Sequence, residues 1–141
     1  MSFENIMSIS GGALDAQTAR INLAASNIAN ADTVDTSPEQ AFKAKRIVFK
    51  TILEDEVYRG GRAIAGGVKV SEIIEDQSTN PSHYDPFHPL ANEEGYVFGS
   101  NVDVMTEMVD IQAAARSFES SVEASNTAKR LMMRTIEMLQ K

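Results

Sequence analysis

The sequence contains no cysteine and no tryptophan, and each absence removes classes of function. Without cysteine there can be no disulfides, thiolate metal sites or cysteine nucleophiles. Aromatic residues make up only 6% of the 141 residues, which is few for stacking nucleic-acid bases. The net charge of −7 also disfavours non-specific binding to nucleic acid or anionic lipid. We therefore expect no nucleic-acid partner.

Long hydrophobic runs and a secretory signal are missing as well. No apolar run approaches the ~20 residues of a membrane-spanning helix, so we expect no direct membrane insertion. The first ten residues lack a basic region followed by an apolar core, so no cleavable signal peptide is expected. With 43% hydrophobic and 23% charged residues, the composition predicts a soluble chain of one ordinary domain. On these grounds alone the expected compartment is the cytoplasm.

The longest regular pattern is an apolar stripe between Asn101 and Lys141, uninterrupted by Pro or Gly. Its spacing of three and four predicts one amphipathic helix of roughly 55–60 Å with a coiled-coil-like seam. Asn101 or Asp103 can cap its start. A patch of small residues around Ser125 interrupts the heptad count, as at a stammer. The stripe consists of Val104, Met108, Ile111, Ala115, Phe118 and Val122, and resumes at Ala128, Met132, Ile136 and Leu139.

Such a helix is longer than a compact fold of this size needs, so we expect partners along its length. The alternative is an ordinary core helix.

A second helix is predicted over Ser2–Ala31, where Leu14, Ile21 and Ile28 are seven residues apart. Gly11 and Gly12 weaken it, and they mark either a hinge or the true start of the helix. Asparagines, Asn27 and Asn30 among them, lie beside an alanine-rich face. Buried amides would specify register, whereas exposed ones would only end the helix, and both alternatives stay open.

The middle of the chain is predicted to be rich in β-structure. Strands at 40–52 and 68–74 flank a glycine-rich connection, which predicts an antiparallel hairpin. A third short strand is expected at 95–98. Residues 31–40 and 77–92 carry prolines and turn formers, so we expect loops there.

The only basic cluster is Lys43, Lys45, Arg46 and Lys50. It could bind nucleic acid, but in a chain this acidic we favour a solvated strand face or an ion-pair surface.

Catalytic chemistry has little support in the sequence. His83, Asp85 and His88 share a proline-rich loop and could bind a metal, but two imidazoles and one carboxylate are a weak signal. We favour a rigid turn in which these side chains satisfy backbone groups. No phosphate-binding loop, dinucleotide fingerprint, nucleophile elbow or metalloprotease pair is present. We therefore expect no enzyme activity, no cofactor and no metal.

Both ends of the chain resemble a known family. Residues 13–33, A-L-D-A-Q-T-A-R-I-N-L-A-A-S-N-I-A-N-A-D-T, resemble the N-terminal signature of flagellar rod and hook proteins, and S-N-I-A-N-A is its most specific part. Four segments resemble the C-terminal half of the same family: 95–104, 107–109, 115–118 and 126–129. Residues 67–70 and 84–89 narrow the resemblance to subunits of the proximal rod of the flagellar basal body.

The resemblance implies an α+β fold, with long N- and C-terminal helices paired as an antiparallel coiled-coil-like core and a small β-rich middle domain. The expected divisions are an N-terminal helix of the rod core domain in 1–33, a β-rich middle domain with loops in 34–100, and the long C-terminal helix in 101–141. It also implies a structural subunit that passes the flagellar type III export apparatus without a cleavable signal. Copies of the chain and other flagellar rod proteins would then assemble into a hollow helical shaft in the periplasm, which replaces the cytoplasmic expectation.

The subunit interface is expected on the helices, at Leu14, Ile21, Asn27, Ile28, Asn30, Val104, Met108, Ile111, Ala115, Phe118, Val122, Met132, Ile136 and Leu139. Two other functions stay open. A soluble coiled-coil adaptor or secretion chaperone would form a fixed small oligomer, and a metal enzyme would purify with stoichiometric metal.

Overall fold

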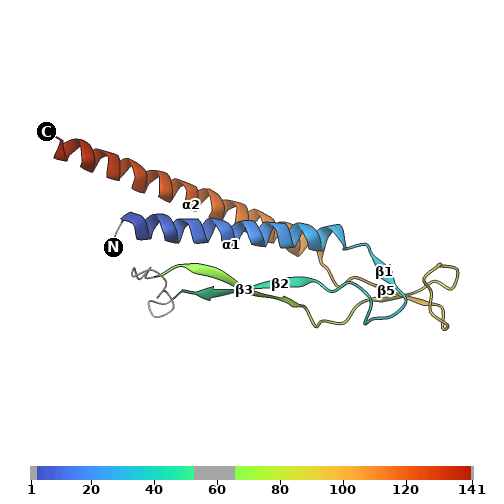
Figure 1. Ribbon diagram of the computed structural model, residues 1–141. Helices are drawn as coiled ribbons and strands as arrows, with labels where there is room; N and C mark the ends of the chain where they lie inside the picture. Colours follow the sequence, from blue (N-terminus) through green and yellow to red (C-terminus); the bar gives the residue numbers. More distant parts are fainter. Residues whose placement is uncertain (1–2, 53–65, 141) are drawn as a thin grey trace.

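A computed structural model describes residues 3–52 and 66–140 of the chain. Helices α1 (Phe3–Ala29) and α2 (Val104–Leu139) lie side by side and antiparallel, so the two termini are at the same end of an elongated molecule (Figure 1). This pairing and the predicted fold class are confirmed. Asp103, one of the two expected caps, caps α2 by accepting a hydrogen bond from the Met105 amide.

The predicted hairpin is formed by β2 (Lys45–Thr51) and β3 (Val68–Glu75). The strands are antiparallel, with Lys45 opposite Glu75 and an irregularity between Val48 and Phe49. Both strands contact α1, which is therefore the middle layer between α2 and the hairpin (Figure 1).

A second, smaller sheet lies at the end of the molecule away from the termini (Figure 1). Its strand order is β1 (Val34–Asp35), β5 (Tyr96–Gly99), β4 (Ser82–Tyr84), and both pairs are antiparallel. The predicted third strand is β5. Strands β1 and β4 lie in segments that were predicted as loops, because strands of two and three residues give no periodic signal.

Helix α1 continues through Gly11 and Gly12, so neither a hinge nor a start is found there. A β-carbon added at Gly12 would lie 3.0 Å from the backbone oxygen of Val68, whereas one added at Gly11 would have no neighbour within 4 Å. Gly12 therefore allows the backbone of β3 to approach the helix closely.

The apolar core of the described residues is small. The two largest fully buried side chains are polar, Asn27 and Glu107. The chain has an accessible surface of 9919 Å², while a compact protein of its mass exposes only about 7,200 Å². The buried apolar residues are Ala16, Ala24, Ala41, Ala44, Val97 and Ala114.

The predicted phase of the α2 seam is wrong by one residue at two positions. Glu107 is buried and Ser121 is half-buried, whereas Met108 and Val122 are exposed. Ala115 is half-buried as predicted, but its neighbour Ala114 is fully buried. The prediction followed apolarity and passed over Glu107, which can face the seam because partners compensate its charge.

The expected stammer is also absent. Half-buried Ser121, Ser125 and Ala128 continue the three-four spacing through the small-residue patch. The patch is therefore part of the seam, and its small side chains suit the close pairing of two helices.

Candidate subunit interface

Asn27 joins α1 to β2 through both ends of its amide. Its Nδ2 donates to the backbone oxygen of Lys45 at 2.9 Å, and its Oδ1 accepts from the Lys45 amide at 2.9 Å. The same Nδ2 lies 3.1 Å from Oε2 of Glu107, to which it donates. Of the two alternatives for this residue, the buried amide is the correct one, and its role in setting register stays a prediction.

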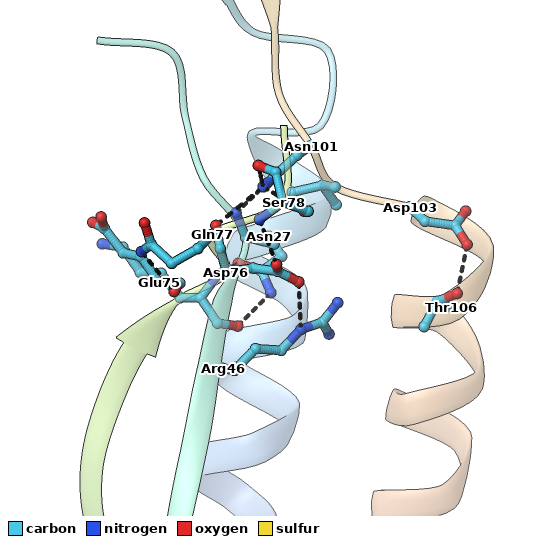
Figure 2. Close-up of polar contacts among 12 residues, drawn as sticks. Asn27, Arg46, Glu75, Asp76, Gln77, Ser78, Asn101, Asp103 and Thr106 are labelled. Carbon is cyan, nitrogen blue, oxygen red and sulfur yellow. Dashed lines mark hydrogen bonds and ion pairs between the residues drawn. The ribbon is translucent and has the colours of Figure 1, made fainter. Parts of the chain in front are cut away.

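Glu107 connects α2 to the same point. Its Oε1 accepts from the Arg46 guanidinium at 2.7 Å. Figure 2 shows the other contact of Arg46, whose Nε lies 3.7 Å from a carboxylate oxygen of Asp76. These partners compensate the burial of the carboxylate. The interpretation of the basic cluster as an ion-pair surface is confirmed for Arg46.

Two further asparagines hold the segment that leads into β2. Asn101 accepts from the Ala44 amide at 2.6 Å and donates to backbone oxygens of Asp76 and Ser78 (Figure 2). Asn80 donates to the backbone oxygens of Phe42 at 3.0 Å and Gly99 at 2.8 Å. Neither role was predicted, since Asn101 was expected only as a possible helix cap and Asn80 not at all. Amides that bind irregular backbone follow no periodic pattern.

Two carboxylates of this region are stabilised in their charged form. The Ser78 amide and hydroxyl, with Arg46 nearby, hold the pKa of Asp76 below its usual value. The Thr106 hydroxyl and the Met105 amide lower the pKa of Asp103 in the same way (Figure 2).

The loop considered for metal binding has the expected structural role. Asp85 accepts from the Phe87 amide at 3.2 Å, and Nδ1 of His88 accepts from the Leu90 amide at 3.1 Å. The turn interpretation is confirmed for these two side chains. Across residues 3–52 and 66–140, no group of three His, Asp or Glu side chains is placed to hold a metal.

The predicted interface residues differ in exposure. Half-buried members are Leu14, Ile21, Ile28, Asn30, Val104, Ile111, Ala115 and Phe118. Asn30 donates to the backbone oxygen of Ser26, one turn earlier in α1. The exposed members are Met108, Val122, Met132, Ile136 and Leu139, all on α2. The exposed group is the one available to other subunits, and its role in an interface stays a prediction.

Among the described residues, no helix lies beside the last turns of α2 (Figure 1). Helix α2 has 36 residues and α1 has 27, so α2 is longer by roughly 13 Å. Met132, Ile136 and Leu139 continue the seam on this segment, and Leu139 is 81% exposed. We call residues 129–139 the overhang. At its base, a groove between the two helices is lined by Phe3, Ile6, Ala128, Leu131 and Met132, among others.

A long chain with a small core and an apolar helix face left uncovered has the features of a subunit of a larger assembly. Two family profiles match its ends: "Flagella basal body rod protein" over residues 7–34 and "Flagellar basal body rod FlgEFG protein C-terminal" over residues 93–138.

Curated relatives match nearly the whole chain. It is 44% identical over 138 residues to flagellar basal-body rod protein FlgC of Escherichia coli O6:H1, covering 98% of both chains. It is 42% identical to FlgC of Salmonella typhimurium over 98% of both. With FlgC of Bacillus subtilis it shares 37% identity over 94% of this chain and 95% of the relative.

The chain belongs to the FlgC family of flagellar basal-body rod proteins, and it is a structural subunit of the rod. These relatives are structural proteins, and they do not favour an adaptor or chaperone. Within the described residues, no helix is both long and apolar enough to cross a membrane.

Proposed function

We propose that this chain is a subunit of the proximal rod and that the flagellar type III apparatus exports it without removing a signal peptide. In the periplasm it joins copies of itself and other flagellar rod proteins in a hollow helical shaft. The names of the relatives support a place for this chain in the flagellar rod. The export route and the proximal position rest on the resemblance of residues 67–70 and 84–89 to proximal-rod subunits.

The observation that carries the proposal is the uncovered overhang. Met132, Ile136 and Leu139 repeat the spacing of the seam that pairs α2 with α1, yet in the described chain they stay 41%, 37% and 81% exposed. Exposed apolar seams bind a further apolar surface. A neighbouring subunit in a helical assembly supplies that surface in every repeat.

The test replaces Ile136 by aspartate. This residue lies beyond the paired part of α2, so Ile136→Asp should leave the helix pair and export unchanged while blocking assembly. Burying an unpaired carboxylate costs several kcal/mol, and each 1.4 kcal/mol is a tenfold loss of affinity. We expect normal subunit levels in the periplasm, none in isolated basal bodies, and no motility.

The matched control is Glu119→Gln, an exposed change on the same helix, which should leave motility and basal-body content unaltered. Normal rods built from the Ile136→Asp chain would contradict the proposal. Loss of the chain from the periplasm as well would place the defect in export instead.

A further inference from the structure

The two ends of this elongated molecule expose different surfaces (Figure 1). The overhang lies at the end that carries both termini. At the opposite end is the loop between β4 and β5, residues 85–95, which with Tyr84 and Tyr96 we call the tip.

The tip is aromatic, acidic and firmly held. Phe87 is 95% exposed. Tyr84 and Tyr96 pack edge to face with ring centroids 5.2 Å apart, and Gly95, at φ +82°, lies tight against the Tyr84 ring. A fixed turn that presents a bare aromatic side chain loses little conformational freedom on binding. The acidic groups of the tip are Asp85, Glu93 and Glu94.

The overhang is apolar and carries an excess of basic groups, with Glu137 as its one acidic residue. Met138 and Leu139 are its most exposed apolar side chains. Arg130 and Arg134 are one turn apart and share a helix face, with Lys129 adjacent. In the described part of the chain, none of these basic groups and none of the tip carboxylates is in an ion pair.

We propose that the tip of one copy of this chain docks on the overhang of a second copy, head to tail. The proposal rests on the proposed function and names the partner of one face of the overhang. At 3.6 residues per turn, Arg130, Arg134 and Met138 lie on the side of α2 away from Met132 and Ile136. Phe87 packs against Met138 and Leu139, and methionine suits an aromatic contact. Glu93 and Glu94 of the tip then face the Arg130 and Arg134 side chains of the other copy.

The charges also set the direction of assembly. Two tips repel each other, as do two overhangs, because each carries an excess of one sign of charge. The contact is therefore heterologous, and repeating it extends an open chain of subunits instead of closing a dimer.

The absence of cysteine allows a direct test with Phe87→Cys combined with Leu139→Cys. A disulfide requires the two α-carbons to lie within about 7 Å. After mild oxidation of isolated basal bodies, we expect a ladder of covalent oligomers from this pair. Each single variant should stay monomeric, and so should a control pair, Phe87→Cys with Glu119→Cys.

Dimers from a single variant would show that like ends meet, and would overturn the proposal. A cross-link to a different protein, a ladder from the control pair, or no ladder from the test pair would overturn it as well.

Charge reversal gives a second test that needs no cross-link. Glu93→Lys with Glu94→Lys, and separately Arg130→Glu with Arg134→Glu, should each lower the amount of the chain in basal bodies about tenfold. Combining all four changes should restore it to within about twofold of the parent. The contact would be contradicted if either double variant assembled normally, or if the combination of all four changes did not restore assembly.

The outcome can be separated from that of the proposed function. If the parent chain is found in basal bodies while Ile136→Asp is not, failure of both tests rejects only the head-to-tail contact. Absence of the parent chain from basal bodies rejects the proposed function itself.

Discussion

At the scale of single residues, the chain relies on side-chain amides where a larger protein would use an apolar core. Asn27 satisfies both backbone groups of Lys45 and one oxygen of Glu107. Asn80 and Asn101 bind the backbone of the same segment from other directions. Because these groups are shielded from water, removing one partner leaves several of them unsatisfied.

Asn27→Leu is therefore expected to destabilise the chain strongly. Each buried backbone group left without a partner costs about 1–3 kcal/mol, so we expect a loss of roughly 3 kcal/mol in the free energy of unfolding. Denaturant unfolding of the purified chain measures it. Asn22→Leu, an exposed change on the same helix, should have almost no effect. Equal losses in the two variants would contradict the role assigned to Asn27.

Acid should weaken the cap of α2. The pKa of Asp103 lies below its ordinary value of 3.8, so its carboxylate stabilises the fold above that pH, and the stabilisation is lost as pH falls further. The pKa of Asp76 is lowered too, so its carboxylate also stabilises the fold at higher pH and loses this effect in acid. Asp103→Asn keeps an oxygen that caps the helix but does not titrate. Between about pH 5 and about pH 3, its melting temperature should therefore fall less than that of the parent. Parallel curves would show that this carboxylate does not contribute.

At the scale of elements, the sequence predicted the helices and strands that have a periodic apolar pattern. Both long helices end within two or three residues of the expected positions, and the hairpin pairs as expected. The seam of α2 was misplaced because polarity was taken to exclude Glu107, whose burial depends on Arg46, a residue 61 positions away. Strands β1 and β4 of the small sheet were missed because strands of two and three residues are fixed by pairing with β5 and leave no periodic pattern. The assignment of interface residues and the division into domains stay predictions.

The packing of β3 on α1 predicts different effects at adjacent glycines. Alanine at an exposed helix position gains up to about 1 kcal/mol over glycine. Gly11→Ala should approach that gain, since its β-carbon meets nothing. Gly12→Ala should gain less or destabilise, because its β-carbon presses on the Val68 carbonyl. Thermal unfolding of both variants checks this, and equal gains would show that the hairpin does not constrain the helix.

At the scale of the whole molecule, the exposed area exceeds that of a compact protein by about 2,700 Å². That excess is comparable with the area buried in an obligate interface. The apolar core is mostly alanine, so the free chain has little to hold its helices. We therefore expect the helices to be fully stable only when neighbouring subunits pack against them.

Amide hydrogen exchange of the free monomer tests this consequence. We expect exchange across Leu14–Ile28 and Ile111–Leu139 to be much faster than in the assembled rod, and fastest in the overhang, since helices with few tertiary partners are less stable in water. Strong protection of these segments in a verified monomer would mean that the helices are already stable without neighbouring subunits.

The most direct measurement is a density map of isolated basal bodies that resolves this chain in the rod. We expect α1 and α2 to stay paired and a neighbouring subunit to cover Met132, Ile136 and Leu139. A map in which these side chains face open solvent or the central channel, with no subunit against them, would contradict the role of the overhang.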